Sequence, residues 1–204
     1  MDAINAKYNF SKKQIKDSAE TAYKTLNSDD IFPVPIDEIL EIRLGYSIIP
    51  IPRLKLDLDI DSFITKNQEL YIDEAIYMAR NNQRYRFSFA HELGHIFLHD
   101  TFFNNITCLN DLISAYKNIS PDMLTNIETQ ANQFASFFLC PYGKIIWAIK
   151  NFVIKEFNDF GVQPANDDIE EAALNFQISK IAGYFAVSNH AMTIRMINYF
   201  KNKL

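Results

Sequence analysis

The sequence predicts an α+β fold, in which a short β-sheet is followed by helices. A β-rich run at 46–51 is closed by two prolines. The segments 62–65 and 69–73 flank Lys66-Asn67-Gln68, which predicts a hairpin. The hairpin is expected to lead directly to the first of two long helical patterns, and this order of strands before helices is typical of a small α+β core.

The N-terminal segments come before the sheet. Residues 1–10 are expected to form a loosely held tail, and a helix is predicted from Ser11 to Leu26 with Ser11 as its cap. A second helix is predicted over 36–44, ending at Gly45. Residues 57–61 alternate leucine or isoleucine with aspartate, and an exposed acidic loop is favoured there over a strand.

Composition excludes several classes of protein. Hydrophobic residues make up 48% of the 204 residues and charged residues 22%, as in ordinary globular proteins. A net charge of −5 argues against a primary nucleic-acid surface. Cys108 and Cys140 fit neither a disulfide framework nor a C-x-x-C site, and no signal-peptide or membrane-spanning stretch is visible, so a cytoplasmic protein is expected.

The pentapeptide His91-Glu92-Leu93-Gly94-His95 carries the most specific chemical pattern. On a helix the two histidines differ by about 40° in azimuth and about 6 Å along the axis, so both rings can reach one ion. Glu92 falls beside that ion, where the general base for a zinc-bound water must sit. Apolar neighbours predict a buried helix, and buried histidines need partners. The pattern therefore favours a catalytic Zn²⁺ site over polar residues on a solvated face.

A catalytic zinc needs a third protein ligand. His99 begins about 12 Å along the axis from His91, too far to converge, and is interpreted as a helix-end histidine. The extended H-E-x-x-H-x-x-G-x-x-H pattern fails at Leu98 and Thr101. Glu128 lies at the flank of the apolar stripe of the next long helix, predicted over 122–139. It is the favoured ligand, the alternatives being a buried ion pair or a capping or surface glutamate.

These residues carry a family resemblance. The string Arg84-Tyr-Arg-Phe-Ser-Phe-Ala-His-Glu-Leu-Gly-His-Ile-Phe-Leu-His99, with Glu128-Thr-Gln-Ala-Asn-Gln-Phe-Ala135 and Leu139-Cys-Pro141, resembles the ImmA/IrrE family of zinc metallo-endopeptidases. The resemblance implies a gluzincin-like peptidase core with Glu128 as the third zinc ligand. Weaker similarity extends to 34–40 and to 181–188, the latter resembling the helical tail of the family. Cys140 departs from the larger side chain that is usual before the proline.

The resemblance also implies a function. Known members of the family cleave helix-turn-helix repressors, so the expected activity is hydrolysis of a peptide bond in such a repressor, which relieves repression. Zinc would activate the water, and Glu92 would pass its proton to the leaving amine. The strand at 69–73 is our candidate for an edge strand that pairs with the substrate, the alternative being an inner strand. The oxyanion donor, the cleaved bond, the activating signal and the oligomeric state do not follow from the sequence.

The C-terminal third is predicted to be helical. After a helix over 144–157 and another over 167–176, the segments 178–185 and 191–200 have the spacing of a helix-turn-helix. Its basic residues are few, chiefly Lys180 and Arg195 before Lys201 and Lys203, so a packing or partner-docking role is favoured over DNA binding.

Three parts are expected: an N-terminal helical segment at 1–30, a zinc peptidase core at 31–143 and a C-terminal helical subdomain at 144–204. The alternative function is a non-catalytic, zinc-stabilised binding or transcription-regulatory protein. A closed structural site would need a fourth ligand from His99, His190 or a cysteine.

Overall fold

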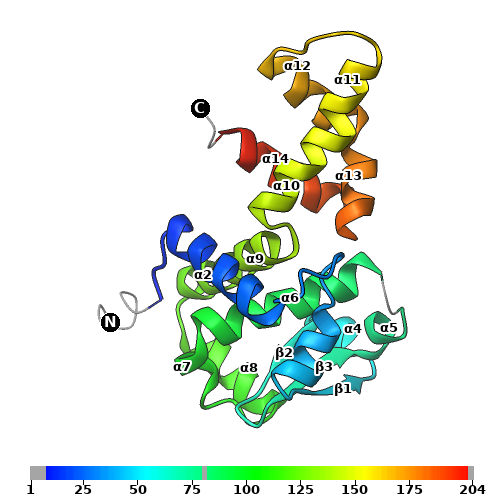
Figure 1. Cartoon of the computed structure of the whole chain (residues 1–204). Helices are drawn as coiled ribbons and strands as arrows, with labels where there is room; N and C mark the ends of the chain where they lie inside the picture. The colour runs from blue at the N-terminus through cyan, green and yellow to red at the C-terminus, as the bar shows by residue number, and fades with distance from the viewer. Residues whose placement is uncertain (1–7, 80–81, 202–204) are drawn as a thin grey trace.

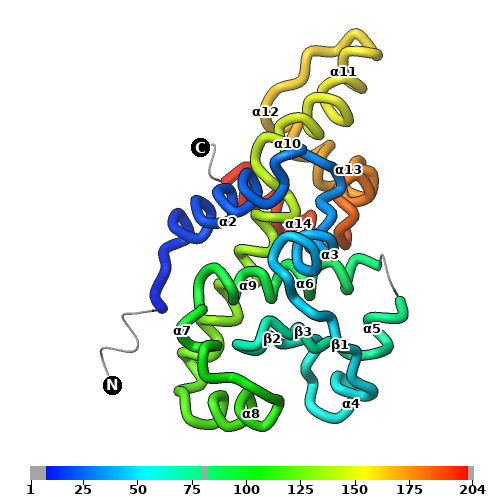
Figure 2. Tube along the Cα trace, turned by 60° about the horizontal axis from the view of Figure 1, so that its bottom comes forward, coloured from blue at the N-terminus to red at the C-terminus, as the bar shows by residue number. Residues whose placement is uncertain are grey.

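A computed structural model describes residues 8–79 and 82–201. The small sheet lies at one end of the molecule, the long helices α6 and α9 cross its middle, and α10 to α14 form the opposite end (Figures 1 and 2). In chain order, with η for π-helical turns, the elements are α2 (Lys12–Leu26), α3 (Ile36–Glu38), η1 (Ile39–Arg43), β1 (Ser47–Ile51), α4 (Leu54–Leu58), β2 (Ser62–Ile64), β3 (Glu69–Asp73), α5 (Glu74–Met78), α6 (Gln83–Leu98), α7 (Asp100–Phe103), α8 (Leu109–Asn118), α9 (Pro121–Leu139), α10 (Tyr142–Ala148), η2 (Ile149–Ile154), α11 (Lys155–Asp159), α12 (Asn166–Glu171), η3 (Ala172–Phe176), α13 (Ile178–Phe185) and α14 (Asn189–Lys201).

The sheet confirms the predicted hairpin and corrects its edge. The strand order is β1-β3-β2, with β2 antiparallel and β1 parallel to β3. The expectation that Glu69–Asp73 is an edge strand is therefore wrong, because β3 pairs on both sides. The edge strand that contacts α6 is β2, whose Ser62 hydroxyl donates to Glu92.

Two connections differ from the sequence prediction. The acidic segment at 57–61 is solvated as expected, but its first part belongs to the short helix α4, where the apolar Leu54 is buried and Asp57 pairs with Arg53. The hairpin does not lead directly to the next long helix, because α5 lies between them. The Asp73 carboxylate caps α5 by accepting from the backbone N–H groups of Ala75 and Ile76.

The predicted N-terminal helix is confirmed, with Ser11 and Gln14 forming a capping box at its start. Residues 1–7 of the expected tail lie outside the described residues. Tyr8 is not loosely held, because its side chain is only 7% exposed. It packs with Met123 and Ile127 of α9.

The close packing of α6 on α9 positions the functional residues. Each helix begins at a side-chain cap, Asn82 for α6 and Ser120 for α9. Their contact depends on Gly94, where a Cβ atom would lie 3.0 Å from both the Cα and the carbonyl oxygen of Ala131. Only glycine allows this approach, so one face of α6 is held directly against α9.

The C-terminal helices are confirmed, and α13 and α14 are joined by a tight turn in which Ala186 has a φ of 52°. The side chain of Arg195, one of the basic residues expected on this surface, is instead buried at 4% exposure. Lys203 lies outside the described residues. This burial further weakens the DNA-binding alternative. The division of the chain at residues 30 and 143 stays a prediction.

Within the described ranges, no single helix has the length and hydropathy to cross a bilayer. Taken together, α9 and the continuous helix at 142–159 pass that test, but they are bent by 54° at the break between them.

Candidate metal centre

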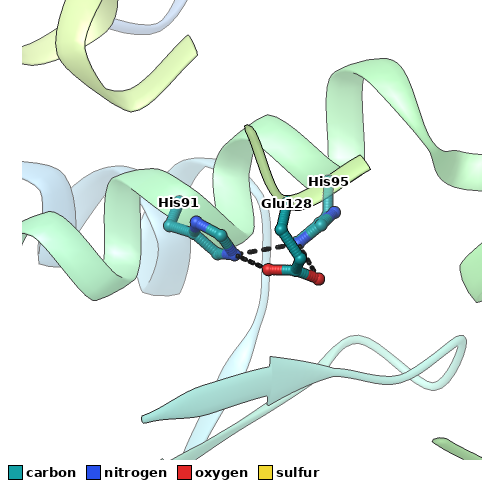
Figure 3. Close-up of side chains that lie close together, drawn as sticks. All are labelled: His91, His95 and Glu128. Atoms are coloured by element: carbon teal, nitrogen blue, oxygen red, sulfur yellow. Dashed lines mark hydrogen bonds and ion pairs between the residues drawn. The ribbon is translucent and has the colours of Figure 1, made fainter. Parts of the chain in front are cut away.

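Two histidines of α6 and one glutamate of α9 converge on one point (Figure 3). The Nε2 atoms of His91 and His95 lie 2.9 Å apart, and Glu128 places one oxygen 3.1 Å from His91 Nε2 and the other 3.7 Å from His95 Nε2. Donor atoms around a tetrahedral ion with bonds of about 2.0–2.2 Å lie about 3.3 Å apart. The three side chains could therefore hold one metal ion.

Hydrogen bonds behind His95 fix which of its nitrogens faces the cluster. The Tyr8 carbonyl can only accept a hydrogen bond, and it lies 2.7 Å from one atom of the side-chain amide of Gln130, so that atom must be the donor Nε2. The other atom of the amide, Oε1, is then an acceptor, and it accepts from His99 Nε2 at 3.0 Å. His99 Nδ1 then carries a lone pair, which accepts the Nδ1 proton of His95 at 3.1 Å. The chain of bonds leaves a lone pair on His95 Nε2, directed at the cluster.

The other two members of the cluster are also held from behind. His91 Nδ1 lies 2.9 Å from the Asn132 side-chain oxygen, which accepts its proton and so directs the Nε2 lone pair of His91 inward. The Tyr116 hydroxyl donates to Glu128 Oε1 at 3.0 Å. Two imidazole nitrogens and a carboxylate thus meet at one point, a donor set that suits a metal cation.

The charges of the cluster are strongly coupled in the metal-free chain. Burial lowers the pKa of His91, but the bond to Glu128 and the charges nearby outweigh it and raise that pKa to about 9. Burial lowers the pKa of His95 to about 4. For Glu128, burial opposes ionisation, but its bonds to both histidines hold its pKa far below the ordinary value. The cluster therefore shares one proton, which stands where a cation would.

Glu92 lies beside the cluster and is 2% exposed. Ser62 Oγ donates to its Oε1 at 2.7 Å, while Oε2 is buried and has no hydrogen-bond partner among the described residues. Burial raises the pKa of Glu92 to about 7. A carboxylate with one oxygen anchored, one oxygen unpartnered and a pKa near neutrality is suited to accept a proton and return it.

A cleft of about 400 Å³ opens onto these groups. Its walls include Ser62 and Phe63 of the edge strand and the side chain of Tyr116. The groups of the cluster and Glu92 also line it. A molecule in this cleft would contact both the cluster and the strand.

His99 illustrates what sequence reasoning missed. It caps the C-terminus of α6 as expected of a helix-end histidine, but it is fully buried and contacts His95. The signal in the sequence was its i+4 spacing from His95, the same spacing that relates His95 to His91. As a fourth ligand it is badly placed, because its Nδ1 faces the outer nitrogen of His95 rather than the cluster.

The fold and this site define a metallopeptidase-like α+β protein. The chain belongs to the Peptidase_M78 family, because the family model, described as the IrrE N-terminal-like domain, matches residues 55–196. The resemblance to the ImmA/IrrE family is thereby confirmed.

Other comparisons add little. Among solved structures the chain is similar to a Mycobacterium tuberculosis transcriptional regulator, with 15% sequence identity and a TM-score of 0.48. The similarity covers 86% of this chain, which spans only 44% of that structure. A search of curated proteins found no match.

Proposed function

We propose that the protein is a zinc-dependent endopeptidase that cleaves a protein substrate, of which a helix-turn-helix repressor is the candidate class. The observation that carries this proposal is the buried, unpartnered Oε2 of Glu92 beside a cluster of three metal-binding side chains. The repressor as substrate rests on the family resemblance alone.

In this proposal His91, His95 and Glu128 hold the zinc ion, for which their nitrogen and oxygen donors are suited. Zinc bound there would supply Lewis acidity for the activation of water and of the scissile carbonyl. Hydrogen bonds from His99, Asn132 and Tyr116 hold the three side chains in their orientations.

Glu92 acts as the general base. Because Ser62 anchors Oε1, the carboxylate cannot rotate away, and Oε2 is left to take the proton of the attacking water. The same carboxyl then gives that proton to the nitrogen of the leaving amine. A pKa near 7 suits both transfers, because neither the charged nor the neutral form is strongly favoured at neutral pH.

The substrate backbone is expected to lie along β2. Pairing of an extended peptide with an edge strand supplies backbone hydrogen bonds that do not depend on sequence. β2 is an edge strand, and Ser62 and Phe63 of this strand line the cleft that contains the cluster. The β-augmentation expected of the strand at 69–73 is thus reassigned to its neighbour.

The test is Glu92→Gln, because the amide keeps the size of the side chain but cannot accept the water's proton. We expect full zinc content, an unchanged fold and a loss of cleavage by several orders of magnitude. Cleavage is measured by mass spectrometry on purified helix-turn-helix repressors and on a mixed peptide library. Cleavage by Glu92→Gln at the wild-type rate would refute the role of Glu92.

A further inference from the structure

A second and larger groove lies beside the metal cleft, with a volume of about 650 Å³. Its lining residues come mostly from α6 and α9 on one side and from α14 on the other. Phe87 and Asn132 line both the groove and the metal cleft. They stand one helical turn from His91 and Glu128 respectively, so the two cavities meet one turn from the cluster.

Arg195 of α14 lines this groove although its side chain is only 4% exposed. Its Nε donates to the Cys140 carbonyl at 3.1 Å, and its guanidinium carbon lies 5.1 Å from the centre of the Phe137 ring. Arginine ion pairs among the described residues are formed by Arg43, Arg53 and Arg84, not by Arg195.

The other cations near the groove are already engaged. Arg84 forms a two-pronged bond with Asp61, and Lys12 donates to Asn198. The Glu20 carboxylate acts on the charge of Arg195, but it pairs with Lys16 and not with Arg195. A buried guanidinium without a carboxylate in direct contact is costly, and its planar fork matches a carboxylate that enters from the groove. The groove is lined by apolar side chains, including Phe87, Phe137, Val187 and Ile194, and by polar ones of α9, including Thr129, Gln133 and Ser136.

We propose that this groove receives the substrate polypeptide on one side of the scissile bond, and that Arg195 binds an aspartate or glutamate side chain there. The proposal rests on the peptidase function proposed above and adds a specificity site to it. It gives the C-terminal helices a role in substrate recognition.

The position of the acidic residue can be estimated from helix geometry. Phe137, which contacts Arg195, lies nine residues after Glu128 on α9, about 14 Å along the axis. An extended peptide covers that distance in about four residues. Because nine helical residues also turn half a circle beyond two full turns, the path around α9 is longer than this axial distance, and we expect the acidic residue at least four positions from the cleaved bond.

The test measures binding without cleavage. Zinc-loaded Glu92→Gln protein is immobilised, exposed to a random-sequence peptide mixture, and the retained peptides are sequenced. We expect enrichment of aspartate and glutamate at one position. The enrichment should disappear when Arg195→Gln is added and persist when Arg43→Gln is added, since Arg43 is an arginine outside the groove that pairs with Asp29.

A peptide-side comparison covers the case in which Arg195→Gln fails to fold. The best retained peptide is compared with its glutamine counterpart on protein with an intact groove, and the glutamine version should bind about tenfold or more weakly. Equal affinity for the two peptides, or no acidic enrichment, would overturn the proposal. Mapping of cleavage sites with the wild-type protein tests the peptidase function separately.

Discussion

The closeness of α6 and α9 at Gly94 makes Gly94→Ala a sensitive test of how the fold builds the site. An added Cβ would meet the Cα and carbonyl oxygen of Ala131 at 3.0 Å and the Cβ of Phe134 at 3.2 Å. Two of these atoms are backbone, so no side-chain rotation relieves the clash and the helices must separate by a few tenths of an ångström. Glu128 lies one turn before Ala131 and would move away from the histidines.

The matched control is Gly183→Ala, because Gly183 is in the interior of α13 and an added Cβ there meets nothing within 4 Å. Both variants gain about 1 kcal/mol of helix propensity. Overpacking costs Gly94→Ala about 1–3 kcal/mol, so its free energy of unfolding should fall below that of the control by this amount. At about 2–4 °C per kcal/mol, the difference is visible in thermal melting.

Metal affinity should follow the same order. We expect Gly94→Ala to bind zinc about tenfold or more weakly than wild type in a competition titration, whereas Gly183→Ala should be unchanged. Equal stability of the two alanine variants, with wild-type zinc affinity in both, would refute the argument that this helix contact sets the geometry of the cluster.

Three further predictions follow from the hydrogen bonds and charges of the site. Gln130→Leu removes the group that orients His99, so it should weaken zinc binding about 10–100-fold in a competition titration. An unchanged affinity would refute the inference that hydrogen bonds from Tyr8 through Gln130 and His99 fix the tautomer of His95. Tyr116→Phe should weaken zinc binding by a smaller factor, because Glu128 keeps its two histidine contacts; full loss of metal would instead make the hydroxyl essential. Because the pKa of His91 is raised from 6.5 to about 9, the metal-free protein should lose stability as pH rises between those values, and a metal-free His91→Asn variant should not show this slope in thermal melts.

Local helical geometry explains which parts of the site could be predicted. Spacing of four residues places His91 and His95 on one face of any helix, and Glu128 has its phase fixed by the apolar stripe of α9. The meeting of the two helices depends on Gly94, which sequence alone marks only as a helix-weakening residue.

Long-range pairing explains what could not be predicted. The inner position of β3 results from its parallel pairing with β1, more than 20 residues earlier in the chain, and no local pattern encodes that choice. The burial of His99 against His95 could not be predicted, because His99 is the first residue past α6, with φ of −128° and ψ of 23°, so helical phase no longer sets its direction. Its buried partner, Gln130, is fixed by Tyr8 from a segment that composition predicted to be loose.

The central claim is that His91, His95 and Glu128 together hold one zinc ion. Elemental analysis of the purified wild-type protein should give about one zinc per chain, and His91→Ala, His95→Ala and Glu128→Ala should each lose the metal while Glu92→Gln keeps it. Full zinc content in any of the three alanine variants, or loss of zinc in Glu92→Gln, would contradict the account.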